Sequence, residues 1–210
     1  GWISEEEQTR MAHELPQQGL VSGLELVLRS KSGKTIICKY TGYVIQTSTG
    51  DKLFSTAEDI TERKRAEEEL MESKSLVDTV VENVPLMIFL KEATDLRFVL
   101  FNRAGEELLG YDRQALLGKN NLDLFPPEQA AHFMAKDREV LDGEAGMLDI
   151  PEEPIQTARK GQRLLHTRKV CIKGADGVTK YLLGISEDIT ERKRAEEELQ
   201  RTLDSLRKAV

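Results

Sequence analysis

Two side chains suited to ligand binding, His166 and Arg168, alternate along an apolar segment of the 210-residue chain. In a β-strand this spacing places them on one face, together with Leu164, Val170 and Ile172. An upstream segment, aligned by placing Gly33 opposite Gly161, carries apolar residues on the corresponding face: Ile36, Cys38, Tyr40 and Val44. The face is therefore predicted to point inward, where an imidazole and a guanidinium would hold a carboxylate-like ligand.

Simpler roles remain open for these residues. A twisted strand would carry His166 and Arg168 to solvent or to an acidic neighbour such as Glu152 or Glu153, since a surface charge needs no buried partner. Four aromatic residues are further candidates for the lining of the same cavity, with core packing as the alternative role of each: Phe89, Phe101, Phe133 and Tyr181.

Other chemistry has little support. The sequence contains no Gly-x-Ser-x-Gly, no phosphate-binding loop and no His-Asp dyad, so no enzymatic activity is expected. His13, His132 and His166 lack the spacing of metal ligands. Cys38 and Cys171 stand alone in strand-like segments, which is typical of buried, inert thiols in a reducing compartment.

Composition excludes further classes of partner. The net charge is −7 and no basic stripe offsets it, which argues against nucleic-acid binding. The longest apolar run, residues 84–90, is too short to cross a membrane. We therefore expect a cytoplasmic segment without membrane contact, cut from a longer protein whose other parts lie outside this chain.

A 13-residue stretch, residues 58–70, recurs letter for letter at residues 187–199 and marks two duplicated units. Each copy lies where a β-rich block gives way to a charged helix. Its Asp-x-x-Glu spacing, Asp59 to Glu62 in the first copy, predicts a capping box at the start of that helix. The stretch is therefore predicted to be a joint between modules.

The sequence of this joint resembles the end of a PAS sensor domain in bacterial signalling proteins. It reads Asp-Ile-Thr-Glu-Arg-Lys-Arg-Ala-Glu-Glu-Glu-Leu. The resemblance implies an α+β fold with a five-stranded antiparallel sheet, short flanking helices and a small central cavity. Some PAS domains bind flavin through a cysteine in a Gly-x-Asn-Cys-Arg stretch, but here residues 118–122 place Asn121 at the thiol position. A flavin adduct is thus excluded. Haem is not indicated either, because Met134 rather than His132 matches the usual ligand position.

The resemblance divides the chain into four parts: the C-terminal half of a first PAS domain (1–61), a linker helix (62–84), a complete PAS domain (85–190) and an outgoing helix (191–210). Periodicity and turn residues predict a helix over 1–22, with a turn bracketed by Gly19 and Gly23. The predicted strands are 24–29, 34–46, 52–57, 86–90, 97–102, 147–155, 164–172 and 179–186, and a longer helix is predicted over 127–141.

The resemblance also implies signal relay from a stimulus in the cavity to the outgoing helix, with Asp59, Thr61, Asp188 and Thr190 as the relay residues. Heptad-like seams in both helices and an exposed sheet edge predict a homodimer. The tail resembles the segment that precedes HD-GYP phosphodiesterase domains, and a histidine kinase or a diguanylate cyclase is the alternative output domain. A ligand-free dimerisation spacer is the competing function.

Overall fold

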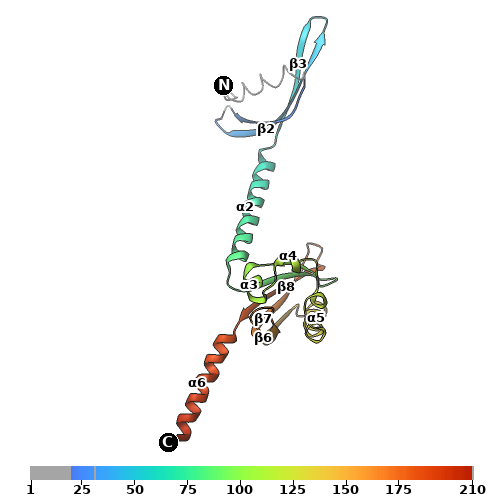
Figure 1. Ribbon diagram of the computed structural model, residues 1–210. Helices are drawn as coiled ribbons and strands as arrows, with labels where there is room; N and C mark the ends of the chain where they lie inside the picture. The colour runs from blue at the N-terminus through green and yellow to red at the C-terminus, as the bar shows by residue number, and fades with distance from the viewer. Residues whose placement is uncertain (1–19, 31, 210) are drawn as a thin grey trace. The chain divides into compact units, whose positions relative to one another are not determined.

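The structure is a computed structural model that describes residues 20–30 and 32–209 (Figure 1). The chain forms two compact units, Gly1–Leu76 and Val77–Val210. The helix predicted over residues 1–22 lies mostly outside the described residues, but residues 20–22 already belong to a strand.

The first unit contains an antiparallel sheet in the order β1-β2-β3, made of β1 (Leu20–Arg29), β2 (Thr35–Thr47) and β3 (Gly50–Asp59). Gly23 has a positive φ of 75°, and the pairing register shifts between Val21 and Leu24, so this glycine lies in a β-bulge rather than in the predicted turn. The core is small and consists of Val21, Leu24, Leu26 and Tyr40, with Leu28 packed against it. Every residue of β3 is exposed.

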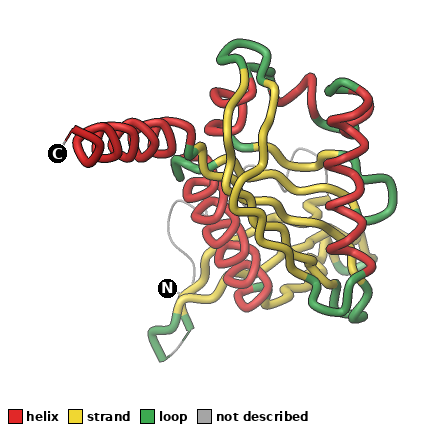
Figure 2. Tube along the Cα trace, turned by 90° about the horizontal axis from the view of Figure 1, so that it is seen from below, coloured by secondary structure: helices red, strands yellow, loops and turns green. Residues whose placement is uncertain are grey.

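The second unit has the predicted five-stranded antiparallel sheet, in the order β5-β4-β8-β7-β6. Its strands are β4 (Met87–Glu92), β5 (Phe98–Phe101), β6 (Met147–Gln156), β7 (Gln162–Lys173) and β8 (Thr179–Asp188). The last strand in the sequence is thus the central strand of the sheet. Because α6 (Thr190–Ala209) follows β8 directly, this helix continues from the central strand, and it runs to the C-terminus (Figure 2).

Helices cover one face of this sheet: α3 (Arg103–Leu109), α4 (Arg113–Leu116), the 3₁₀ turn η1 (Asn121–Asp123) and α5 (Pro127–Asp142). Pro127 occupies the first turn of α5, as expected for a residue without an N–H donor. This helix packs along β6, β7 and β8 (Figure 1). The buried residues of α5 are Ala130, Phe133, Asp137 and Val140, which recur at helical spacing on its inner face.

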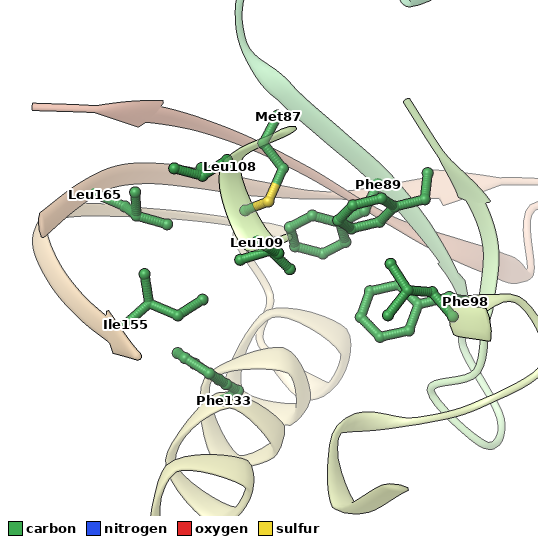
Figure 3. Close-up of a cluster of buried hydrophobic side chains, with 10 residues drawn as sticks. Met87, Phe89, Phe98, Leu108, Leu109, Phe133, Ile155 and Leu165 are labelled. Carbon is green, nitrogen blue, oxygen red and sulfur yellow. The ribbon is translucent and has the colours of Figure 1, made fainter. Parts of the chain in front are cut away.

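The core between sheet and helices is aromatic. Phe98 packs edge-to-face against both Phe89 and Phe101, with ring centroids 5.8 and 5.7 Å apart. Side chains of Phe133, Ile155 and Leu165 project toward one another from α5, β6 and β7 (Figure 3). A cavity lies beside these rings.

The helix α2 (Thr61–Asn83) begins in the first unit and ends in the second. Its seam residues Leu70, Val77 and Val80 are more than half exposed, and so are Leu199 and Leu206 of α6. No helix among the described residues is both long and apolar enough to cross a membrane.

Candidate functional site

The second unit contains a cavity of about 30 Å³ between the sheet and α5. Nine of its fourteen lining residues are apolar: Met87, Phe89, Phe98, Phe101, Leu109, Phe125, Phe133, Ile155 and Leu165. The other five are polar: Lys91, Asn121, Glu153, Lys169 and Ser186. Space on this scale holds one or two water molecules or the polar head of a compact ligand.

Five buried polar and charged residues lie at the cavity, and we call them the polar cluster: Lys91, Asn121, Asp137, Glu153 and Lys169. Asp137 of α5 is at its centre and is fully buried. Its two carboxylate oxygens accept hydrogen bonds from the ammonium groups of Lys91 on β4, at 2.5 Å, and Lys169 on β7, at 2.7 Å. One carboxylate therefore joins the helix to two strands that are not neighbours in the sheet.

Burial opposes charge pairing in the polar cluster. It lowers the pKa of Lys91 to about 8, although the carboxylate of Asp137 opposes the shift. Burial would raise the pKa of Asp137, but the ammonium groups of Lys91 and Lys169 outweigh it and hold that pKa below its usual value. The Lys91 ammonium also lies 4.7 Å from the centroid of the Phe98 ring, where the ring face attracts a cation.

Two buried polar atoms of the cluster have no hydrogen-bond partner: Asn121 Nδ2 and Glu153 Oε1. The Lys169 ammonium lies 3.9 Å from Glu153 Oε1, which is beyond hydrogen-bonding distance. Buried polar atoms are nearly always paired, so an unpaired donor and an unpaired acceptor on the wall of one cavity indicate a site for another molecule.

The joint at the start of α6 is a compact hydrogen-bond network. Asp188 Oδ1 accepts hydrogen bonds from the backbone N–H of Thr190, at 3.0 Å, and from its hydroxyl, at 2.5 Å. In turn Thr190 Oγ1 accepts a hydrogen bond of 2.9 Å from the backbone N–H of Leu164 on β7. Lys193, one turn into the helix, forms an ion pair of 2.7 Å with Glu152 on β6.

The first unit repeats this joint at the start of α2. Asp59 Oδ1 accepts hydrogen bonds from the backbone N–H and the hydroxyl of Thr61, and these bonds lower the pKa of Asp59. Thr61 Oγ1 accepts a 2.9 Å hydrogen bond from the backbone N–H of Ile37. Lys64 pairs with Glu25 at 2.8 Å. Asp59 thus accepts a backbone N–H at the helix start, as predicted, but its partner is Thr61, and among the described contacts none shows Glu62 completing the predicted capping box.

Comparisons with known proteins agree with this architecture. A family model described as a PAS fold matches residues 81–194, more than half of the chain. The chain belongs to the PAS family. A second model, described as a PAS domain, matches residues 2–62.

Two curated relatives of this PAS protein are histidine kinases. The methanogenesis regulatory histidine kinase FilI of Methanothrix harundinacea is 27% identical over 189 residues, which are 88% of this chain and 20% of the relative. A blue-light-activated histidine kinase of Rhizobium johnstonii is 31% identical over 116 residues, 54% of this chain and 32% of the relative. The chain thus spans between a fifth and a third of the length of these relatives.

Solved PAS domains are similar in structure. One from Colwellia psychrerythraea has a TM-score of 0.49 and 18% identity, and the match covers 58% of this chain and 98% of that one. The PAS domain of an HTR-like protein from Haloarcula marismortui has a TM-score of 0.48 and 22% identity, with coverages of 60% and 99%.

The prediction that His166 and Arg168 point into the PAS cavity is wrong. Both side chains lie on the other face of β7 and contact Asp149 on β6 at 2.9 Å, and the Arg168 side chain is 66% exposed. The inward residues of β7 are Leu165, Thr167 and Lys169. The proposed carboxylate-like ligand loses its support with them.

The cause of this error is a one-residue shift between the duplicated units. Equivalent positions are identified by the amides that the joint threonines cap, Ile37 in the first unit and Leu164 in the second. Aligning Gly33 with Gly161 instead places Leu165 opposite Ile37. Because side chains alternate along a strand, a shift of one residue moves every side chain to the opposite face.

Three of the four aromatic candidates line the cavity, as predicted, and one does not. Phe89, Phe101 and Phe133 line the cavity, whereas Tyr181 is 39% exposed and lies outside it. The polar cluster was not identified from the sequence. Asp137 did carry a signal, because it occupies the inner face of α5 in register with Phe133 and Val140, where an unpaired carboxylate would be costly.

Proposed function

We propose that the second unit is a signal-sensing PAS domain whose cavity receives the input and whose joint at Asp188 and Thr190 passes a structural change to α6. The observation that carries this proposal is that residues of the cavity and residues of the joint are separated by only one or two positions along the chain. Cavity residue Leu165 directly follows Leu164, the residue whose amide Thr190 caps. Cavity residue Ser186 precedes Asp188 by two positions on the same central strand.

The incoming helix is coupled to the same PAS domain at its end. Asn102, fully buried, donates hydrogen bonds to the carbonyl oxygens of Val81 and Leu86. The Arg113 guanidinium forms ion pairs of 2.6 Å with Glu82 of α2 and with Glu106 of α3. Both helices are thus attached to the domain by buried or multiply bonded polar groups, which supports a role in transmission. A shift of this kind needs a bias of only a few kcal/mol between two states.

The output domain that we propose is a histidine kinase domain outside this chain, because both curated relatives are histidine kinases. Catalysis would then belong to that domain and not to residues 1–210.

In the full-length protein, Asp188→Ala should leave the PAS domain folded and abolish the change in kinase autophosphorylation that a stimulus produces. The matched control is Asp176→Ala, which removes an exposed carboxylate from the β7–β8 turn. A normal response of Asp188→Ala would refute the relay.

A second candidate function is a ligand-free dimerisation spacer. It is favoured by the small volume of the cavity and by the exposed apolar residues of α2 and α6, which would form a seam between two chains. In the first unit, the exposed strand β3 corresponds to β8, which pairs with β4 in the second unit, so a sheet edge is an alternative contact. Native mass spectrometry separates these functions: a small molecule lost on denaturation supports the sensor, and a dimer without one supports the spacer.

A further inference from the structure

The two unpaired atoms of the polar cluster define the chemistry of a molecule that would fit between them. The orientation of the Asn121 amide follows from its neighbour. The Lys91 ammonium can only donate, so the atom 3.0 Å from it is Asn121 Oδ1 and the amide nitrogen is the unpaired one. Asn121 therefore offers a donor to the cavity, and Glu153 Oε1 offers an acceptor.

The charge of the polar cluster constrains the ligand further. Two lysines face two carboxylates, and these four charges sum to zero when all are ionised. An anion or a cation added to this group would be buried without a counter-charge, and burying an unpaired charge is costly. A neutral molecule avoids this cost.

The remaining wall of the cavity is apolar and aromatic, so water alone would leave most of it without favourable contacts. We propose that the second PAS domain binds a compact, neutral organic molecule whose head both accepts a hydrogen bond from Asn121 Nδ2 and donates one to Glu153 Oε1, as a primary amide or a lactam does. Its apolar part would contact the phenylalanine rings around the cavity. This inference rests on the proposed sensor role and names the class of input.

Four probes of nearly equal shape test the head group: acetamide, acetone, acetate and acetamidinium. Each has four non-hydrogen atoms. Acetamide both donates and accepts, acetone only accepts, acetate is an anion and acetamidinium is a cation that only donates. Each is titrated into the 210-residue protein at constant ionic strength, and binding is followed through the NMR methyl signals of Leu165 and Met87. Molecules this small bind at roughly millimolar concentrations at best.

Acetamide should bind about tenfold more tightly than acetone, the effect of one hydrogen bond, and by a larger factor than acetate or acetamidinium, which each add a buried unpaired charge. The substitution Asn121→Leu should weaken the binding of acetamide and of acetone about tenfold each, because both lose the same donor, and acetamide should stay ahead through the hydrogen bond that it donates to Glu153 Oε1. The matched control is Gln129→Leu, which also removes a side-chain amide with one buried unpaired atom, its Oε1, from a residue that does not line the cavity. It should change none of the affinities.

Three outcomes overturn the inference: acetate or acetamidinium binds as well as acetamide, Asn121→Leu leaves acetamide binding unchanged, or no probe binds to the folded wild-type protein. The last outcome means that the cavity holds only water. None of these results depends on the relay. If acetamide binds as expected and Asp188→Ala does not alter the kinase response, the ligand class stands and the proposed relay fails.

Discussion

The substitution Asp137→Asn tests whether the polar cluster is held together by charge. It keeps the shape of the side chain but removes the counter-charge of Lys91 and Lys169, which are both almost fully buried. Removing one member of a buried ion pair usually costs about 3–5 kcal/mol. The matched control is Asp149→Asn, which loses a carboxylate from the exposed contact with His166 and Arg168 and should cost far less, because solvent screens exposed ion pairs.

The loss of unfolding free energy in Asp137→Asn has an upper limit, because a buried lysine without its counter-charge can release its proton. A buried lysine can become neutral, and at pH 7 this costs about 1.4 kcal/mol for each pH unit below its unfolded pKa of about 10.4, or about 5 kcal/mol per lysine. At pH 9 the same limit is about 2 kcal/mol. The folded pKa of Lys91 is already lowered to about 8, so the unfolded chain binds more protons between pH 8 and 10.5 and the free energy of unfolding rises with pH there.

The difference in unfolding free energy between wild type and Asp137→Asn should therefore narrow as pH rises from 7 to 9. It should also narrow in acid, because the lowered pKa of Asp137 gives stability that is present above pH 3.8 and is lost as pH falls through the folded pKa. The assay is urea unfolding of the 210-residue protein, followed through methyl signals of Leu165 and Leu182 in the second unit. A cost equal to that of Asp149→Asn at pH 7, or a difference that stays constant up to pH 9, would refute the reasoning.

Three further predictions concern the joint, the sheet and the corrected strand face. Thr190→Val removes the hydroxyl that caps a β7 amide, so it should cost about 1–3 kcal/mol and speed hydrogen exchange at that amide, whereas Thr190→Ser should do neither. Gly184→Ala places a methyl group in the space of the Phe89 ring and should cost at least about 1–3 kcal/mol in a thermal melt; an unchanged melting temperature would contradict that packing. Arg168→Ala should raise the pKa of Asp149 toward its ordinary value in an NMR titration, because the Arg168 hydrogen bond is the main cause of its lowering, and a constant pKa would show that the contact is absent.

Local sequence was sufficient to predict the order and type of most elements. Alternation, turn glycines and the position of Pro127 predicted the strands and α5 to within a few residues, because these features depend on neighbours along the chain. The repeat located both joints, and in each the Asp–Thr pair is closed by groups only two residues apart. Such contacts are encoded locally, so the sequence alone could locate them.

Tertiary structure alone decided which polar side chains line the cavity and which face of β7 points inward. Asp137 meets Lys91 and Lys169 across 46 and 32 residues of sequence, and no local pattern links them. The inward face of β7 was wrong by one residue in the alignment of the two units, so His166 and Arg168 were predicted where Leu165 and Lys169 lie. Side chains on a strand alternate with a period of two, so composition predicts that a strand has a buried face, and only pairing with its neighbours determines which face that is.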